Sequence, residues 1–330
     1  MIQTLNKKRV LKYLIIALAS LCTLLAIALV VLYIMPHRSE RLQQTSTKTF
    51  SYEEAVKQIS AQQKKDQAQK NFEEGCETQS YLHDKKVART VVLFHGIVAC
   101  PQQYSTVAKA FFEAGYNVYV PLAPEHGTTD NPEATSDITL NSLTRYVGNS
   151  YSVATGLGDE IGFVGLSGGG ALATWGAQYI DGVSRLLVLS PFYRTTQQAA
   201  PNWQYPFLLS LYGMNLAPDR QVQDFSIRAL TKYLILVENY REDLKAPHLK
   251  HVAVITSAND KDIDLDLAHR IPSKLAKNSA ASFQHTRLAP ELGIGHDMLS
   301  PEQSAVKKHQ KQLNNLYLSF YENRPPAKEL

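Results

Sequence analysis

The sequence is poor in cysteine, with three residues of this type among 330, and it contains no internal repeat and no low-complexity tract. His248 and His251 have a spacing that resembles a pair of metal ligands, but no carboxylate or cysteine motif accompanies them. Structural metal sites are normally built from several such ligands in a recognisable spacing. We therefore expect neither a metal nor an organic cofactor.

An excess of one charge is also missing from most of the chain. The formal net charge is +4, but Lys7, Lys8, Arg9 and Lys12 all lie in the first twelve residues, which hold no acid. The remaining sequence is therefore neutral and gives no support for nucleic-acid binding. A hydrophobic content of 44% in 330 residues is sufficient for one large domain with appendages.

Residues 13–35 contain no charged side chain at all. A helix of this length is about 34 Å long, enough to cross the hydrocarbon core of a bilayer. A cleaved signal peptide is the alternative, but the following "YIMPHRSER" lacks a small-residue cleavage site, and bulky Leu21 before Cys22 does not suit a lipoprotein site. We expect an uncleaved transmembrane anchor, with residues 1–12 in the cytoplasm. Residues 36–330 would then lie on the non-cytoplasmic side, which is the periplasm if the source is bacterial.

The two remaining cysteines, Cys76 and Cys100, bracket a predicted strand. A disulfide can persist on the non-cytoplasmic side of a membrane. We expect Cys76 and Cys100 to be paired, and two buried free thiols are the alternative.

Residues 36–80 are polar and rich in Gln, Lys and Glu, and Ser51 and Glu54 have the spacing of a capping box. We interpret this segment as a largely exposed helical stalk or linker that lifts the domain, residues 81–330, off the membrane.

From residue 87 onward, short apolar runs alternate with helical stretches. The runs are rich in β-branched residues and lie at 90–94, 116–120, 161–165, 185–189 and 252–256. Continuous apolar runs are typical of parallel strands that are buried on both faces. The alternation predicts an α/β fold with a mostly parallel, doubly wound sheet.

The interval 195–247 interrupts this alternation and is too long for an ordinary strand-to-helix connection. We interpret it as an inserted cap, and helices that pack on the main sheet are the alternative. Its aromatic residues between 203 and 214 would form the wall of an acyl pocket, or would simply pack in the core. Near the end of the chain, Ser300, Pro301 and Gln303 predict the start of a final helix.

Four candidate site residues follow predicted strands or lie in glycine-flanked loops. Reactive groups in open α/β sheets gather at the carboxyl ends of the strands. His95 follows the strand at 90–94, Ser167 that at 161–165 and Asp260 that at 252–256, while His296 lies in the loop "ELGIGHDML".

These residue types suit acyl transfer by a serine nucleophile. Serine is a weak nucleophile, so an imidazole must accept its proton, and a carboxylate must orient that imidazole. Ser167, Asp260 and His296 occur in the chain order expected for the serine, acid and histidine of this fold class. The oxyanion that forms needs N–H donors, for which we expect the backbone N–H groups of Gly168 and Ile97.

Five segments together resemble the α/β-hydrolase superfamily, and within it the carboxylesterases and monoacylglycerol-lipase-like enzymes. The segments are "VVLFHGIVACPQQY", "YVPLAPEHGTTD", "GFVGLSGGGALA", "VAVITSANDKDID" and "GIGHDML". The resemblance covers about residues 87–325, excludes the expected stalk and includes the cap only loosely. It implies a serine hydrolase without a metal, in which His95 and Gly96 support the oxyanion loop and His126 braces its own loop.

The sequence departs from the family pattern at two places. Three consecutive glycines follow the serine at 168–170, and four aspartates crowd the acid loop at 260, 262, 264 and 266. Asp260 is favoured as the acid because Ile263 then takes the aliphatic position that follows it, and Asp262 or Asp264 is the fallback.

The prediction is thus a membrane-anchored serine hydrolase of carboxylic esters that acts on a small-molecule or lipid ester. Thioester or amide hydrolysis on the same residues is the alternative within enzymes. A non-catalytic binding module with this fold is the alternative outside them.

Overall fold

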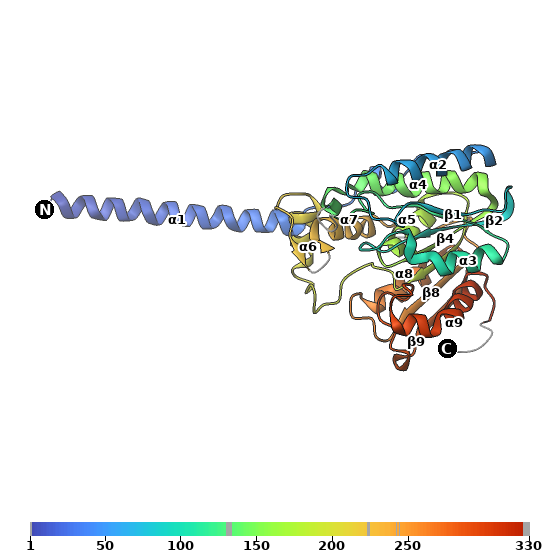
Figure 1. Cartoon of the computed structure of the whole chain (residues 1–330). Coiled ribbons are helices and arrows are strands. Elements are labelled where there is room, and N and C mark those ends of the chain that lie inside the picture. The colour runs from blue at the N-terminus through green and yellow to red at the C-terminus, as the bar shows by residue number, and fades with distance from the viewer. Residues whose placement is uncertain (1, 130–133, 223–224, 242, 244, 326–330) are drawn as a thin grey trace.

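The computed structural model describes residues 2–129, 134–222, 225–241, 243 and 245–325. Its main sheet has seven strands in the order β1-β3-β2-β4-β5-β8-β9 (Figure 1). All neighbouring strands are parallel except β1 and β3. The strands are β1 (Gln79–Tyr81), β2 (Val87–Phe94), β3 (Asn117–Val120), β4 (Gly158–Leu166), β5 (Val183–Leu189), β8 (His251–Ser257) and β9 (Ser282–Leu288).

Helices cover both faces of this sheet, as the alternation of apolar runs and helices predicts. One face packs against α3 (Ser105–Glu113) and α9 (Ser304–Tyr321). The other face packs against α4 (Leu140–Leu157), α5 (Gly168–Tyr179) and α8 (Leu265–Asn278). Successive residues of a strand point to opposite faces, so Val91 and Val92 enter the two different cores.

The five predicted strands are all present as β2, β3, β4, β5 and β8, whereas β1 and β9 are the two edge strands and had no apolar run to mark them. Strand β9 is only partly buried and alternates exposed with covered residues. The final helix begins at Ser304 rather than at residue 301. The Ser300 hydroxyl and backbone N–H both bond to Asp297, so these residues form a turn ahead of the helix.

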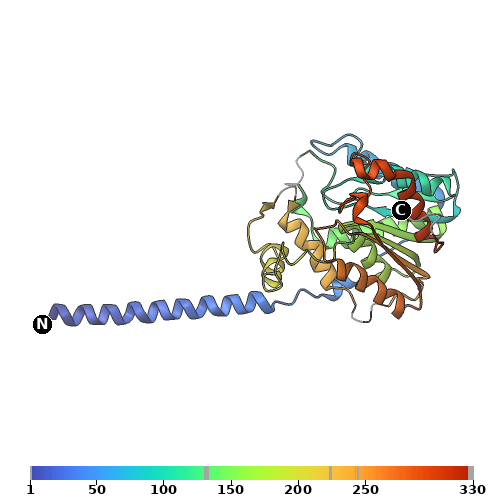
Figure 2. The same cartoon turned by 90° about the horizontal axis from the view of Figure 1, so that it is seen from below.

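Helix α1 (Ile2–Ile34) projects from the domain as a single rod (Figures 1 and 2). Residues Arg9–Ile34 form a stretch that is long and apolar enough to cross a membrane. The side chains of residues 9–31 are all exposed, because the helix contacts the domain only at its carboxyl end.

The segment after α1 differs from the expected exposed stalk. Helix α2 (Tyr52–Gln67) has the predicted capping box of Ser51 and Glu54 but packs along α4. Ala55 and Ile59 are buried, and a Cβ atom on Gly156 of α4 would lie 2.7 Å from the Cβ of Ala55. Few apolar residues are needed for this packing because small residues let the two helices approach closely.

Hydrogen bonds hold the rest of this segment on the domain. The Trp175 indole donates to the Leu42 carbonyl oxygen at 2.8 Å, and the Lys48 N–H donates to the Ser152 hydroxyl at 2.9 Å. The short 3₁₀ turn η1 (Glu40–Gln43) lies in this segment. A second short 3₁₀ turn, η2 (Pro101–Tyr104), lies in the loop after β2. Residues 36–80 therefore lie on the domain and do not lift it away from α1.

The interval 195–247 is partly an inserted cap and partly a helix that packs with the helices of the main sheet. Its second half contains α7 (Ile227–Glu238), which packs on α5 and α4. Its first half contains α6 (Tyr205–Leu208), the π-helical turn η4 (Leu209–Gly213) and a small hairpin of β6 (Gln221–Val222) and β7 (Phe225–Ser226). The remaining short turns of the chain are η3 (Ala134–Asp137) and η5 (Pro290–Leu292).

The expected disulfide between Cys76 and Cys100 is present, with the two Cα atoms 5.1 Å apart. It joins the segment before β1 to the loop that follows β2. Cys22 in α1 is the free cysteine of the described residues and is exposed.

Candidate active site

The predicted site residues lie at the carboxyl ends of strands that are close together in the sheet. His95 follows β2 and Ser167 follows β4, two neighbouring strands. Asp260 follows β8 and His296 follows β9, which also neighbour each other. The parallel topology therefore carries these residues to one edge of the sheet.

Ser167 occupies a sharp turn between β4 and α5. Its φ is 55° and its ψ is −121°, a backbone conformation that residues other than glycine rarely adopt. The turn is held by two backbone bonds, from the Ser167 N–H to the Leu189 oxygen at 3.0 Å and from the Phe192 N–H to the Ser167 oxygen at 2.9 Å. Local strain that the surroundings enforce in this way is typical of functional positions.

The glycines around Ser167 permit this turn because the backbone is crowded there. A Cβ atom on Gly165 would overlap the Gly169 carbonyl, and a Cβ atom on Gly169 would overlap the Phe94 carbonyl. Any side chain at these two positions would therefore push α5 away from β4 and β2. The G-x-S-x-G spacing is a steric requirement of this tight connection.

His296 and Asp260 form a hydrogen-bonded pair. The His296 Nδ1 atom lies 2.8 Å from the Asp260 Oδ2 atom, and the Asp260 carboxylate is fully buried. The Asp262 N–H donates to the other carboxylate oxygen of Asp260 at 3.0 Å. The pair therefore fixes the ring of His296 with Nε2 as the nitrogen available to another group.

The electrostatics of the pair favour an ionised Asp260 and a basic His296. Burial alone would raise the pKa of Asp260, but the hydrogen bond and charge of His296 and the N–H of Asp262 hold it below its usual value. Burial alone would lower the pKa of His296, but the hydrogen bond to Asp260 and the negative charges of Asp260, Asp262 and Asp297 raise it above 6.5. A raised pKa makes His296 a stronger base when it is neutral.

The two candidate oxyanion residues lie on either side of the serine. Gly168 is the first residue of α5, where backbone N–H groups have no acceptor within the helix. Ile97 is buried in the loop after β2, and its side chain is so close to Gly168 that a Cβ atom there would overlap it. This contact places the loop of Ile97 against the turn of Ser167.

Three side chains support the loop that carries Gly96 and Ile97. The His95 Nδ1 lies 2.8 Å from the Gly96 oxygen, and its Nε2 accepts the Ala123 N–H at 3.0 Å. Burial and the neighbouring His126 lower the pKa of His95 to about 3, so His95 is neutral. His126 is also buried, and its Nε2 lies 2.6 Å from the Ile97 oxygen.

Gln103 completes this support, since its side-chain oxygen accepts the Gly96 N–H at 3.0 Å. The hydrogen bonds of His95 and His126 are all with backbone groups, of this loop and of the segment after β3.

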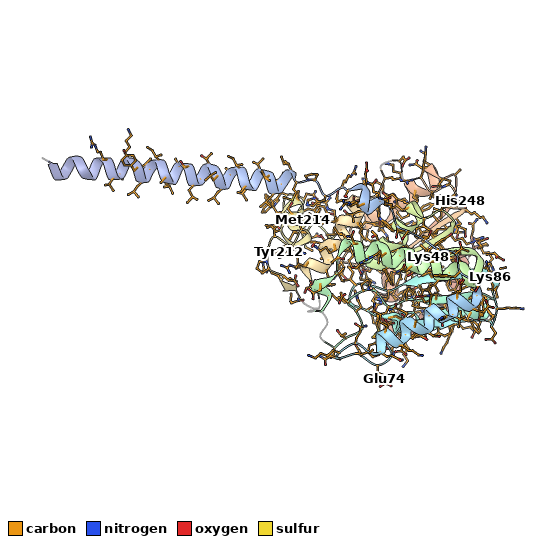
Figure 3. All side chains as sticks on the ribbon, turned by 90° about the horizontal axis from the view of Figure 1, so that it is seen from above. Lys48, Glu74, Lys86, Tyr212, Met214 and His248 are labelled. Atoms are coloured by element: carbon orange, nitrogen blue, oxygen red, sulfur yellow. A yellow bond between two sulfur atoms is a disulfide. The ribbon has the colours of Figure 1, made fainter. Side chains whose placement is uncertain are left out.

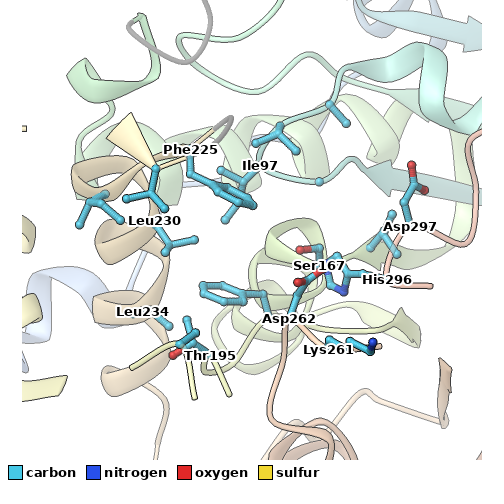
Figure 4. Close-up of a pocket in the computed structure, with 18 of the residues that line it drawn as sticks. Ile97, Ser167, Thr195, Phe225, Leu230, Leu234, Lys261, Asp262, His296 and Asp297 are labelled. Carbon is cyan, nitrogen blue, oxygen red and sulfur yellow. The ribbon is translucent and has the colours of Figure 1, made fainter. Parts of the chain in front are cut away.

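Ser167 and His296 line the same cavity, which has a volume of about 910 Å³ (Figure 4). One part of its wall is apolar and comes from the interval 195–247 and the residues just before it. These apolar residues are Phe192, Leu208, Phe225, Ile227, Leu230 and Leu234. Another part is polar and includes Gln103, Lys261, Asp262, Asp297, Ser300 and Glu302.

The aromatic residues between 203 and 214 do not line this cavity, so the expectation of an acyl wall there is wrong. Tyr205 is buried beneath Arg194, and Trp203 is exposed over 62% of its surface. The apolar wall comes instead mostly from α7 and from Phe225 of β7, with Phe192 and Leu208 beside them. The signal in the sequence was the apolar spacing of Ile227, Leu230 and Leu234, which places them on one face of a helix.

The fallback acids have other positions. Asp264 caps the amino terminus of α8, where its carboxylate accepts the N–H groups of Asp266 and Leu267. Asp262 is exposed at the cavity. Asp260, Asp262 and His296 are the group of three potential metal ligands found among the described residues, with ligand atoms within 4.8 Å of one another.

Two observations argue against a resident metal in the described part of the chain. The Nδ1 of His296 already bonds to Asp260, and Asp262 is exposed, as acidic groups without an ion commonly are. His251 is buried with its Nε2 2.6 Å from the Phe320 oxygen, whereas His248 lies at the surface 4.0 Å from Asp181. His248 and His251 therefore do not converge on one ion.

The sheet, the turn of Ser167 and the order of the strand ends define an α/β hydrolase. A family model described as serine aminopeptidase, S33, matches residues 85–256, just over half of the chain. The chain belongs to this family of α/β hydrolases.

Comparisons of structure agree with this assignment at the level of the fold. One similar structure is from the metagenome-derived lipolytic enzymes LipS and LipT, with 19% identity, a TM-score of 0.53 and coverage of 77% of this chain and 100% of that one. A monoacylglycerol lipase of Paleococcus ferrophilus has 14% identity, a TM-score of 0.52 and coverage of 74% and 99%. No curated protein sequence matches the chain significantly.

Proposed function

We propose that the protein is a membrane-anchored serine hydrolase that cleaves carboxylic esters through an acyl-enzyme. The observation that carries this proposal is the combination of the strained turn at Ser167 with the 2.8 Å pair of His296 and Asp260 on one cavity. Ser167 is the nucleophile, His296 the general base and Asp260 the residue that orients and stabilises the imidazolium.

The proposed reaction begins when Ser167 Oγ attacks the acyl carbon and His296 Nε2 accepts its proton. The negative oxygen of the tetrahedral intermediate is held by the N–H groups of Ile97 and Gly168. His296 then returns the proton to the leaving alcohol, which departs and leaves the acyl group on Ser167. Water, deprotonated by His296, attacks the acyl-enzyme. His296 then returns this proton to Ser167 Oγ as the acyl–oxygen bond breaks and the acid is released.

The cavity supports an ester with an apolar acyl group. The apolar wall around Phe225, Leu230 and Leu234 can receive a hydrocarbon chain, whereas the side with Lys261 and Asp262 suits a polar leaving group (Figure 4). Burial of an apolar chain is favourable by about 0.8 kcal/mol for each methylene group. We therefore propose that the rate constant kcat/KM rises with acyl-chain length until the cavity is filled.

Membrane anchoring by residues 13–35 is the second part of the proposal. The exposed, apolar surface of α1 supports it, since an isolated helix of this kind is unfavourable in water. The basic residues in the first turns of α1, ahead of the uncharged stretch 13–35, favour an amino terminus in the cytoplasm and a domain on the other side. The disulfide of Cys76 and Cys100 supports a location of the domain on the non-cytoplasmic side, because disulfides persist in oxidising compartments.

The proposal is tested by the hydrolysis of p-nitrophenyl esters graded by chain length, with the full-length protein in detergent. We expect kcat/KM to increase from acetate toward longer acyl chains and to fall by about 10⁴-fold or more in Ser167→Ala. Ser60→Ala, an exposed serine of α2, is the matched control and should keep full activity. Hydrolysis by Ser167→Ala at the rate of the control would contradict the assignment of the nucleophile.

Amide hydrolysis is the second candidate, and the description of the matching family as a serine aminopeptidase favours it. Amides, thioesters and esters all use the same nucleophile and oxyanion donors, so the site residues do not distinguish them. The matched aminoacyl p-nitroanilide and acyl thioester should be cleaved more slowly than the ester at equal acyl group. A wild-type protein that cleaves none of the three would instead be a binding module.

A further inference from the structure

Large apolar side chains are exposed at one end of the domain. Among the described residues outside α1, those with the largest exposure are Val98, Trp203, Met214, Leu216 and Val222. All but Val98 belong to the interval 195–247. We refer to Trp203, Met214 and Leu216, which do not line the cavity, as the cap surface. Trp203 precedes α6, and Met214 and Leu216 follow η4, so the three flank one short segment. Exposed apolar groups on one segment are typical of an interaction site.

The segment around α6, which carries the cap surface, lies at the end of the domain from which α1 departs (Figure 1). Figure 3 shows Tyr212 and Met214 near the junction with α1 and Lys86 at the opposite end of the domain. The Ser210 hydroxyl of η4 donates to the Leu32 oxygen at 2.6 Å, and the ring of Phe207 in α6 lies 5.6 Å from that of Tyr33. The chain on both sides of these contacts carries the cap surface.

The residues that follow α1 are also fixed to the domain. The Asn239 side-chain amide donates to the His37 oxygen at 2.8 Å and accepts the Ser39 N–H at 2.7 Å. The Arg38 guanidinium donates to the backbone carbonyl oxygen of Glu238 at 2.9 Å. These bonds fix the segment directly after α1 to the end of α7, so the domain has a defined orientation relative to α1.

These contacts set the depth of the cap surface. Leu32 and Tyr33 belong to the uncharged stretch 13–35, which fills the apolar thickness of a bilayer when α1 crosses it. Since η4 and α6 contact Leu32 and Tyr33, both must lie at the level of the lipid headgroups. Tryptophan is enriched at that level, where its ring contacts lipid and its N–H remains hydrated.

We propose that the cap surface inserts into the headgroup region of the same bilayer that α1 crosses, and that the enzyme takes its ester from this lipid surface. The inference rests on the proposed membrane anchor. Val98 and Val222, which are exposed, also line the cavity that contains Ser167, so the cavity wall is continuous with the apolar end of the domain. A single-chain lipid ester could then enter without leaving the apolar phase.

The depth is measured by the quenching of tryptophan fluorescence in full-length protein reconstituted in phosphatidylcholine vesicles with brominated acyl chains. Trp203 is exposed, whereas the other tryptophan, Trp175, is fully buried with its N–H bonded to Leu42. We expect brominated lipid to quench the wild-type protein and to lose most of this effect in Trp203→Phe. That variant keeps an aromatic ring, and its remaining Trp175 emission reports whether it is folded.

The other outcomes separate this inference from the anchor. Unquenched Trp203 in protein that resists extraction by alkaline carbonate would overturn the insertion of the cap surface and leave the anchor standing. Extraction of the wild-type protein by carbonate would overturn the anchor and this inference with it.

Activity gives a second readout. The double variant Trp203→Ser/Leu216→Ser should cleave a water-soluble short-chain ester as the wild type does, because neither side chain lines the cavity. It should cleave a monoacylglycerol embedded in the vesicles severalfold more slowly. Lys86→Ser, at the end of the domain far from α1, is the control and should change neither rate (Figure 3). If the double variant cleaved both esters at the wild-type rates, uptake from the lipid surface would be contradicted.

Discussion

Ser167 adopts a conformation that serine rarely adopts, and its neighbours determine it. Bonds from β5 and from the chain that follows β5 hold the backbone of Ser167, and bare glycines at 165 and 169 let α5 pack onto two strand ends. The 2.8 Å bond between His296 and Asp260 fixes the base in a comparable way. Both groups are thus held before a substrate arrives, which reduces the entropy that the reaction must lose.

The charge of Asp262 affects the pH dependence of the proposed reaction. Its carboxylate is one of the groups that raise the pKa of His296. The base must be neutral, so kcat/KM falls as pH decreases through this raised pKa, which lies above 6.5. Asp262→Asn removes a charge that stabilises the imidazolium, and we expect the acid limb of the pH profile to move to lower pH.

The measurement is kcat/KM for a soluble ester between pH 5 and pH 9, a range that brackets the ordinary histidine pKa of about 6.5. The shift should shrink at high salt, because Asp262 is exposed and its charge is screened. Asp266→Asn, an exposed residue in the first turn of α8, is the control. A limb that moves to higher pH in Asp262→Asn would refute this electrostatic role.

Sequence reasoning was effective at this scale where a residue type and its position were both constrained. Among four aspartates, Asp260 was chosen because Ile263 follows it at the aliphatic position, and Ile263 is buried and pairs with Thr195. The cavity wall was assigned to the wrong residues, since aromatic content indicates burial but not which surface a side chain faces. That choice depends on how α7 packs against α5, which is a tertiary contact.

At the scale of elements, the buried strands were predictable and the edge strands were not. Strands β2, β4, β5 and β8 are covered on both faces, so the sequence shows them as apolar runs. Strand β9 has one partner and an exposed side, and its residues "SFQHTRL" carry no such run. An edge strand is identified by its hydrogen-bonded pairing with a neighbouring strand, and amino-acid composition gives no information about that pairing.

Helix α2 shows a second limit of composition. It is polar on most of its surface, and this suggested an exposed stalk, but Ala55 and Ile59 are enough to seat it on α4. The carboxylate of Asp66 at its end accepts bonds from Gln62 and from the Thr78 N–H, which joins α2 to the segment before β1. A helix that packs through small residues needs few large apolar ones.

Removing the side chain of Ile59 tests whether α2 is part of the folded domain. We expect Ile59→Ala to lower the free energy of unfolding by about 2–5 kcal/mol, because it leaves a cavity between α2 and α4. The measurement is chemical denaturation followed by circular dichroism in detergent. Gln58→Ala, an exposed neighbour, should change stability by less than about 0.5 kcal/mol. Equal stability of the two variants would return α2 to the role of a stalk.

At the scale of the whole molecule, one disulfide and one apolar helix indicate the same compartment. The disulfide lies in the domain, and the basic residues lie in the first turns of α1, at the other end of the proposed span. The folded part of the chain is nearly neutral, so the proposed membrane contact would depend on apolar surface and not on attraction to anionic lipid.

The disulfide should stabilise the domain by about 2–4 kcal/mol, since it closes a loop of 24 residues in the unfolded chain. We expect a reductant to lower the denaturation midpoint of the wild type and to leave Cys76→Ser/Cys100→Ser unchanged. Thiol labelling of the protein as isolated should modify Cys22 alone once the chain is denatured. Three reactive thiols would place the domain in a reducing compartment and contradict the proposed topology.

The central claim is that Ser167 is the nucleophile of this site, and reaction with a fluorophosphonate probe followed by peptide mass spectrometry tests it most directly. We predict a covalent adduct on the peptide that contains Ser167, formed in the wild type and in Ser60→Ala but absent from Ser167→Ala. His296→Ala should slow the labelling strongly, because no base then accepts the serine proton. Labelling of Ser167→Ala at the wild-type rate, or an adduct on a different serine, would contradict the account.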